Sequence, residues 1–213
     1  TLTITSANIS ISAERVLTFN NAPEYETKTL DKARVTASDG TNSTTQEITV
    51  NINNVNDIAP EFTSDATFSA AENQTAIGTV TATDAEGDSV TFIVSGDELA
   101  ITSAGVLTFV SAPDYETKTT YTATITASDG ANPITQDITV SVTNVNDNSP
   151  VISSSNEYSL EENTTAVGQA TATDADGDGI VFSITSNSDI SIDSSSGVIY
   201  FNTAPDYETT TSH

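Results

Sequence analysis

The sequence predicts an all-β chain built from tandem Greek-key β-sandwich repeats of about 90 residues each. Three observations support this fold class. Apolar residues alternate with Thr and Ser over short runs, the same motifs recur along the chain in one register, and no long segment carries the i, i+3, i+4, i+7 apolar spacing of an amphipathic helix.

The alternating runs predict strands with one face buried and one face in water. Every second residue is apolar over 121–127 and again over 138–142, and the residues between them are Thr or Ser. Thr and Val, which dominate these runs, favour strands because their branched side chains suit an extended backbone. Low hydrophobicity with high net charge is typical of disordered chains, but this periodicity favours a folded sheet.

An internal repeat sets the domain organisation. The segment Phe19–Thr27 returns as Phe109–Thr117 and as Phe201–Thr209, at spacings of 90 and 92 residues. Proline in a recurring Asn-Asp-x-x-Pro segment ends one pattern and opens an extended stretch, so we place the linkers near 57–60 and 147–150. The predicted domains are a partial repeat without its opening strands, a complete repeat, and a partial repeat without its closing strands, at residues 1–57, 58–147 and 148–213.

Charge and composition exclude several classes of function. Thirty acidic and five basic residues give a net charge of −25, which leaves no cationic face for nucleic acid or anionic lipid headgroups. No apolar run approaches the length that spans a bilayer, so we expect no direct membrane insertion. The chain has no Cys, its one His is the last residue, His213, and it carries no phosphate-binding or nucleophile motif. We therefore expect that it is not an enzyme.

The acidic residues gather at the turns, at the same positions in each repeat. Because the turns of a sandwich cluster at its two ends, tracing the strands brings six acids of the middle and third repeats together: Glu72, Asp114, Glu116, Asp147, Asp174 and Asp176. Each unscreened pair at ~4 Å costs on the order of 1 to 4 kcal/mol, and the basic residues are too few to compensate. A cation from solution is therefore expected, and flexible all-oxygen ligands favour Ca²⁺ over Mg²⁺.

Three motifs, found together and in order, resemble the cadherin family, in a form similar to the cadherin-like arrays of bacterial surface proteins. They are Asn144–Pro150, Asp114–Glu116 and Asp174–Asp176. The resemblance implies an immunoglobulin-like sandwich in an extracellular or cell-surface protein, bacterial and either secreted or surface-anchored, with Ca²⁺ at the junctions between repeats. It also implies ligands from the upper repeat, the linker and the lower repeat of the second junction: Glu72, Asp114, Glu116 and Asp147, then Asn146, then Asp174 and Asp176.

The equivalent positions of the other repeats complete the candidate ligands. At the first junction they are Glu24, Glu26, Asn56, Asp57, Asp84, Glu86 and, in the lower-repeat role, Asp129. The first repeat carries Asp39 at the position of Asp129, and the third repeat carries Glu162, Asp206 and Glu208. Glu24 and Glu86 replace Asp of the family pattern and are one methylene longer, so we expect a weaker first site. Asn54 and Asn144 also stand where the family usually has Asp.

The predicted function is a calcium-rigidified segment of a surface adhesin that acts in cell-surface or cell–cell adhesion. Its expected partners are calcium ions, neighbouring repeats of the same chain, and a homophilic protein or a polysaccharide. Two alternatives stay open, namely a carbohydrate- or protein-binding module that uses an exposed strand face, and a structural spacer that ignores calcium.

Two simpler interpretations apply to the acidic turns. Residues 174–179 also resemble the start of an EF-hand loop, but position 12 of that loop is Thr185 and no flanking helices are expected, although Asp178 could assist a local ion. Asp and Asn next to Gly also favour ordinary tight turns. Turn chemistry does not explain Glu72, Glu116 and Glu162, because Glu is a poor turn former.

Overall fold

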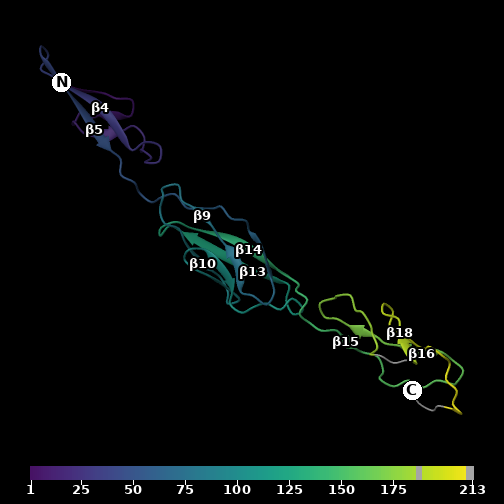
Figure 1. Cartoon of the computed structure of the whole chain (residues 1–213). Helices are drawn as coiled ribbons and strands as arrows, with labels where there is room; N and C mark the ends of the chain where they lie inside the picture. Colours follow the sequence, from purple (N-terminus) through teal and green to yellow (C-terminus); the bar gives the residue numbers. More distant parts are fainter. Residues whose placement is uncertain (186–188, 210–213) are drawn as a thin grey trace. The chain divides into compact units, whose positions relative to one another are not determined.

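The computed structural model describes residues 1–185 and 189–209, so His213 lies outside the described residues. Every regular element within those ranges is a strand, which confirms the all-β prediction (Figure 1). Among the described residues, no helix has the length and apolar character needed to cross a membrane.

The chain divides into two compact units by its internal contacts. Unit 1 comprises Thr1–Phe68, Ala76–Val110 and Tyr121–Val140, and unit 2 comprises Ser69–Thr75, Ser111–Thr120 and Ser141–His213. The division runs through the middle repeat, whose loops at one end belong to unit 2. The repeat boundaries after residues 57 and 147 stay a prediction.

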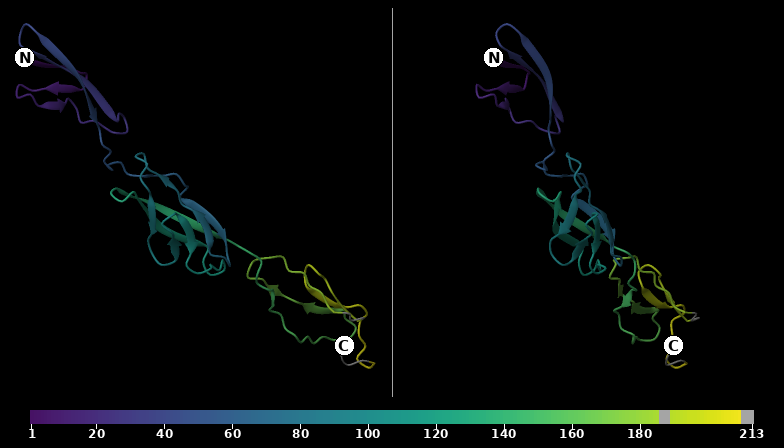
Figure 2. Two further views of the ribbon diagram at one scale, coloured as in Figure 1. Left: turned by 60° about the vertical axis from the view of Figure 1, so that its left-hand side comes forward. Right: turned by 90° about the vertical axis from the view of Figure 1, so that its left-hand side faces the viewer.

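The first repeat is built around a long hairpin, drawn in dark blue and purple (Figure 2). Its three-stranded sheet has the order β1-β4-β5, with β1 at Leu2–Thr5, β4 at Leu30–Ser38 and β5 at Ser43–Asn51. The hairpin pairs continuously from Leu30 with Asn51 to Ser38 with Ser43, and its turn carries Asp39. A second hairpin joins β2, Ile9–Ile11, to β3, Leu17–Phe19.

The middle repeat contains the larger sheets. A four-stranded sheet has the order β10-β13-β14-β7, at Thr91–Val94, Thr120–Ser128, Pro133–Thr143 and Thr67–Ala71. A three-stranded sheet has the order β11-β12-β8, at Leu99–Ile101, Val106–Phe109 and Ala76–Thr79. A short pair joins β6 to β9, at Glu61–Phe62 and Ala82–Thr83.

The core of the middle repeat confirms the alternation in the sequence. Ile125 and Ala127 of β13 are fully buried, and Val140 of β14 is fully buried while its neighbour Ser141 is exposed. The largest fully buried side chains also include Leu107, Ile138 and Val80. Burying these apolar side chains supplies the main stabilisation of the sheets and fixes their register.

The third repeat has shorter strands. A three-stranded sheet has the order β16-β19-β18, at Ala166–Gln169, Val198–Phe201 and Ile190–Ile192, and a short pair joins β15 to β17, at Val151–Ile152 and Ala172–Thr173. Residues 157–161 and 181–184 align with β7 and β10 but form no strand. In the middle repeat β14 and β13 pair with those strands, and the described part of the third repeat has no counterpart of either.

Candidate metal centre

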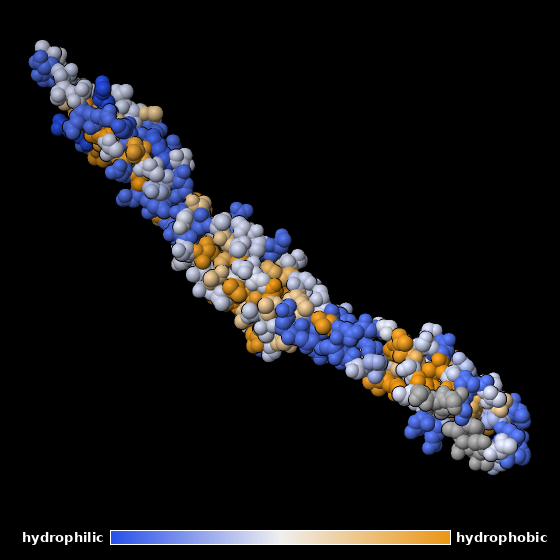
Figure 3. Space-filling model, viewed as in Figure 1, coloured by the Kyte–Doolittle hydropathy of each residue, from blue (hydrophilic) through white to orange (hydrophobic). Residues whose placement is uncertain are grey.

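Four carboxylates of unit 2 converge on one point, and we call them the second cluster: Glu72, Glu116, Asp147 and Asp176. One oxygen from each lies within 4.8 Å of the others. They come from the turn after β7, the loop between β12 and β13, the segment between β14 and β15, and the turn after β17. Figure 3 shows hydrophilic residues gathered where β14 runs into the segment before β15. The structure thus brings together four of the six acids that strand tracing placed there.

Glu72 ties two separate segments of this site together. Its side chain is only 3% exposed. One carboxylate oxygen accepts the backbone N–H of Tyr115 at 2.7 Å, and the other accepts the N–H of Val145 at 2.7 Å. Asn73 follows with a φ of 62°, a left-handed conformation that Asn tolerates better than most residues. This turn aims the Glu72 carboxylate at both segments.

Asp176 holds the linker to the third repeat. Its Oδ2 accepts the backbone N–H of Asp147 at 3.1 Å and of Asn148 at 2.7 Å, and its Oδ1 accepts the Asn148 side-chain amide at 2.9 Å. The Asn148 amide, followed by these backbone donors, holds the pKa of Asp176 below its ordinary value. Asn144, which stands where the family has Asp, donates its amide to the Asp176 carbonyl at 2.7 Å.

Glu116 shows the electrostatic cost of the cluster. Loss of hydration raises the pKa of the Glu116 carboxyl above its ordinary value, and the negative charges of Glu72, Asp176 and Asp114 raise it further. A raised carboxyl pKa means that the surroundings disfavour the anion. A positive charge beside this carboxylate would therefore be favourable.

The remaining candidates of the second junction lie near this cluster without joining it. Asp114 caps its own turn, because its carboxylate accepts the Thr117 N–H at 3.2 Å and the Thr117 hydroxyl at 2.9 Å. Asp174 instead groups with Asp176 and Asp178 in the turn after β17. Asn146 is exposed on the linker. The roles of all these residues as ligands stay a prediction.

The first junction, which lies within unit 1, holds two groups of three carboxylates. We call them together the first cluster: Glu24, Glu26 and Asp57, and then Asp84, Glu86 and Asp88. Oε2 of Glu86 accepts the N–H of Asp57 and of Ile58, both at 2.9 Å. The longer Glu86 side chain thus binds the linker amides as Asp176 does. Gly87, with a φ of 83°, permits the tight turn that places Glu86 beside the linker.

Two buried carboxylate oxygens of the first cluster indicate whether a cation would fit there. Asp84 Oδ2 and Glu86 Oε1 are buried and have no hydrogen-bond partner. Buried polar atoms in folded proteins are normally paired, and an unpaired carboxylate oxygen is costly. These unpaired oxygens lie in a site whose side-chain oxygens come from carboxylates. Such oxygens are suitable ligands for a hard cation such as Ca²⁺.

Asp129 of the β13–β14 turn reaches the first linker through an amide bridge. Its Oδ1 accepts the N–H groups of Ala131 at 2.7 Å and Asn132 at 2.6 Å, and these donors, Asn132 first, lower the pKa of Asp129. The Asn132 side chain then donates to Asn56 Oδ1 at 2.6 Å and to Asp129 Oδ2 at 3.1 Å. Asn56 and Asp129 thus lie together, and their roles as ligands stay a prediction.

Asp39 repeats the local turn of Asp129. Its carboxylate accepts the N–H groups of Thr41 at 2.8 Å and Asn42 at 2.7 Å, and Asn42 is the larger cause of the lowered pKa of Asp39. Among the groups of carboxylates found in the described chain, none includes Asp39.

The third repeat contains a further group of three carboxylates: Glu162, Asp206 and Glu208. Glu162 accepts the N–H of Tyr207 at 2.9 Å, as Glu72 accepts that of Tyr115. These three residues therefore lie together, and Glu162 reproduces one of the two backbone contacts that Glu72 makes in the second cluster.

Sequence reasoning missed two features of these sites. Asp88 belongs to the first cluster, and its alignment with Asp178 in the repeated Asp-x-Asp/Glu-Gly-Asp turn was the available signal. Asn148 contacts three carboxylates of the second cluster. No motif pointed to it, although Ile58 at the aligned position shows that the two linkers differ.

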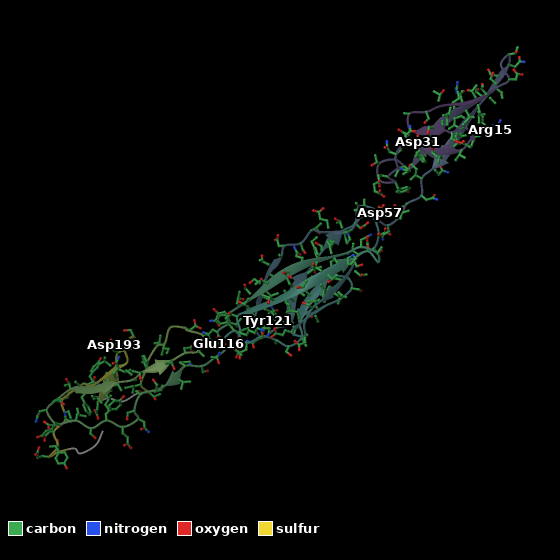
Figure 4. All side chains as sticks on the ribbon, turned by 180° about the vertical axis from the view of Figure 1, so that it is seen from behind. Arg15, Asp31, Asp57, Glu116, Tyr121 and Asp193 are labelled. Carbon is green, nitrogen blue, oxygen red and sulfur yellow. The ribbon has the colours of Figure 1, made fainter. Side chains whose placement is uncertain are left out.

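Two lysines of the first repeat form ion pairs with acids that belong to none of the carboxylate groups found in the described chain. Lys28 pairs with Asp31 at 2.8 Å and Lys32 pairs with Glu47 at 2.9 Å. Arg15 lies in the turn between β2 and β3, away from Asp57 (Figure 4). In both ion pairs, the lysine therefore contacts an acid outside the first cluster.

Comparison with curated proteins finds protocadherins, and no family model matches the chain. The chain is 42% identical over 106 residues to human protocadherin-15, 36% over 182 residues to protocadherin-11 X-linked of Pongo pygmaeus, and 34% over 207 residues to protocadherin Fat 4 of Mus musculus. The matches cover 45%, 75% and 84% of this chain, but the chain spans only 5%, 13% and 4% of the lengths of those relatives. These relatives are animal proteins and lend no support to the expected bacterial origin.

Comparison with solved structures finds the same fold. Mouse cadherin-23 EC22-24 matches with a TM-score of 0.73 and 23% identity, over 98% of this chain and 77% of that one. Mouse protocadherin-24 EC1-3 matches with a TM-score of 0.76 and 23% identity, over 98% and 78%. The cis-dimer structure of protocadherin gammaB7 EC3-6 matches with a TM-score of 0.78 and 21% identity, over 97% and 60%. These likenesses establish the β-sandwich fold of the repeats.

Proposed function

Because the repeats of this chain are cadherin-like domains, we propose that the chain is a calcium-binding segment of an extracellular adhesin, stiffened where its repeats join. The convergence of four carboxylates from four separate segments within 4.8 Å carries this proposal. One of them, Glu72, is 3% exposed, so the site includes a charge withdrawn from water. Such an arrangement is costly without a cation.

Two residues of the second cluster hold different parts of the linker. Glu72 fixes the loop before β13 and the start of the linker through the N–H groups of Tyr115 and Val145. Asp176 fixes the end of the linker through the N–H groups of Asp147 and Asn148. A bound Ca²⁺ would supply the positive charge that offsets the mutual repulsion of these carboxylates. The linker would then be held from both sides, and the repeats would turn less freely about it.

Calcium affinity need not be high for this role. An ion that binds only the ordered state stabilises it by RT ln(1 + [L]/Kd), about 2.7 kcal/mol at a concentration of 100 times Kd. Extracellular modules with weak sites operate at about millimolar calcium. Weak sites of this kind are sufficient in an extracellular setting.

The adhesive part of the proposal rests on the relatives. The gammaB7 structure is a cis-dimer, which supports a second protein of the same kind as the partner. The expected neighbours along the chain are further repeats. The expected setting is extracellular, since the chain also resembles the extracellular domain of protocadherin gammaB4. A polysaccharide partner and a bacterial source remain expectations from the sequence alone.

The test compares the chain in millimolar calcium and in excess chelator, by thermal melting and small-angle scattering. We expect a higher melting temperature and a longer maximum dimension in calcium. Glu72→Gln removes the buried charge and should reduce the calcium response, while Glu157→Gln, at an exposed site outside the clusters, should leave it unchanged. Identical curves with and without calcium would refute the proposal and favour a calcium-independent spacer or a binding module.

A further inference from the structure

The Asn148 side chain contacts three of the four carboxylates of the second cluster. Its Nδ2 donates to Asp147 Oδ1 at 2.8 Å, to Asp176 Oδ1 at 2.9 Å and, more weakly, to Glu116 Oε2 at 3.3 Å. Ionised carboxylates only accept hydrogen bonds, so the amide must present its NH₂ group to them. Asn73 donates a further side-chain hydrogen bond to Asp147. Amide hydrogens thus partly satisfy three of the four carboxylates.

The first cluster has the same backbone frame but lacks this amide. Glu86 accepts the N–H groups of Asp57 and Ile58, as Asp176 accepts those of Asp147 and Asn148. Ile58 stands at the position of Asn148 and has no side-chain donor. In the first cluster Asp84 Oδ2 and Glu86 Oε1 are left buried without a partner. Besides the Glu-for-Asp replacements and Glu72, which has no counterpart in the first cluster, the two junctions therefore differ in whether an amide side chain faces the carboxylates.

We infer that Asn148 sets the calcium response of the second junction by standing in for the cation. Without an ion, its amide holds Asp147 to the Asp176 turn, and an arriving ion must displace it. The first junction has no such substitute, so its linker is the less ordered of the two in chelator. The calcium half of the inference rests on the proposed function, whereas the ion-free half does not.

Hydrogen exchange of the whole chain, resolved at each linker, tests both halves in one molecule. The exchange rates of residues 54–58 and 144–148 are followed in chelator and then across a calcium titration. Asn148→Ile gives the second linker the residue of the first, and Ile58→Asn makes the reciprocal change. Asn148→Ala repeats the first variant without added bulk, in case Ile disturbs the fold.

Asn148→Ile should speed exchange of the second linker in chelator by about three- to tenfold, the loss expected for one ordinary hydrogen bond at an exposed site. It should also lower the calcium concentration that half-protects this linker by a similar factor, because the ion no longer competes with the amide. Ile58→Asn should shift the first linker in the opposite directions, while the unmutated linker of each variant serves as the control.

Unchanged exchange of the second linker in chelator would overturn the inference. It would also be overturned if Asn148→Ile required more calcium, because Asn148 would then be a ligand instead of a substitute. If neither linker of the parent chain responds to calcium, the proposed function fails, and the chelator comparison alone still decides whether Asn148 holds the linker.

Discussion

At the scale of single residues, the role of a carboxylate depends on which hydrogen-bond donors face it. Asp114 accepts hydrogen bonds from Thr117 within its own turn, whereas Glu72 accepts hydrogen bonds from backbone N–H groups of two distant segments. The sequence predicted both as ligands because both occupy motif positions. Spacing alone does not report which oxygens are already paired, so it named the four carboxylates of the second cluster together with Asp114 and Asp174, whose roles as ligands stay a prediction. It also missed Asn148, whose role depends on a contact across the fold.

Asp193 provides a pH-dependent test of a carboxylate outside the clusters. It lies in the turn between β18 and β19 (Figure 4). Its Oδ1 accepts the N–H of Ser196 at 2.8 Å, the hydroxyl of Ser195 at 2.8 Å, the hydroxyl of Ser196 at 2.9 Å and the N–H of Ser195 at 3.1 Å. These donors, led by the Ser196 N–H, lower the pKa of Asp193 strongly from its ordinary 3.8.

A lowered folded-state pKa means that the folded chain binds this proton more weakly than the unfolded chain. The stabilisation from Asp193 is therefore complete above its ordinary pKa of 3.8 and is lost as pH falls toward the folded value. We expect Asp193→Asn to lower the melting temperature at pH 7 and to have a smaller effect at pH 3. Melts of both proteins at the two pH values check this, and an equal loss at both would contradict the ionised turn.

At the scale of elements, periodicity predicted the long strands and failed for the short ones. The runs over 121–127 and 138–142 fall within β13 and β14, where burial of alternate side chains fixes the register. Residues 157–161 carry apolar side chains at alternate positions, Tyr158 and Leu160, yet form no strand. A strand needs a hydrogen-bonded neighbour as well as a pattern. Two-residue strands such as β6 and β9 are too short to show any period.

The turn between β11 and β12 depends on a glycine. Gly105 has a φ of 88°, and a Cβ there would lie 2.1 Å from the carbonyl oxygen of Val80. Gly197 repeats the arrangement against Ala170, with a φ of 73° and a distance of 2.3 Å. The close approach lets the N–H of Val80 donate to the Gly105 carbonyl at 2.8 Å. The turn is thereby joined to the residue that follows β8.

We expect Gly105→Ala to destabilise the chain by more than the cost of the backbone conformation alone. The matched control is Gly96→Ala, because Gly96 has a φ of 81° but nothing within 4 Å of a built Cβ. A left-handed conformation costs a non-glycine residue roughly 1–2 kcal/mol, which both variants should lose. Only Gly105→Ala adds the clash with Val80. Urea unfolding measures the difference, and equal losses would show that the turn can move away.

At the scale of the whole molecule, a net charge of −25 raises the question of whether calcium acts by binding or by screening. Any salt weakens repulsion between distant exposed charges, because the Debye length is about 10 Å at 0.1 M. Within each group of clustered carboxylates, one oxygen of each residue lies within 4.8 Å of the others, and Glu72 is nearly buried. Dissolved salt screens such short and partly desolvated contacts poorly. The general charge and the clusters should therefore respond to different ions.

We expect NaCl to raise the melting temperature of the chain in chelator gradually over tenths of molar, as distant charges are screened. Millimolar CaCl₂ should produce a further rise that saturates and persists when NaCl already sets a high ionic strength. MgCl₂ at the same concentration should produce a smaller rise, since Mg²⁺ keeps its waters and demands a stricter geometry. Melting curves over this ion series separate the two effects. If NaCl or MgCl₂ at matched ionic strength reproduces the calcium curve, the acids are a screened surface and the clusters bind no specific ion.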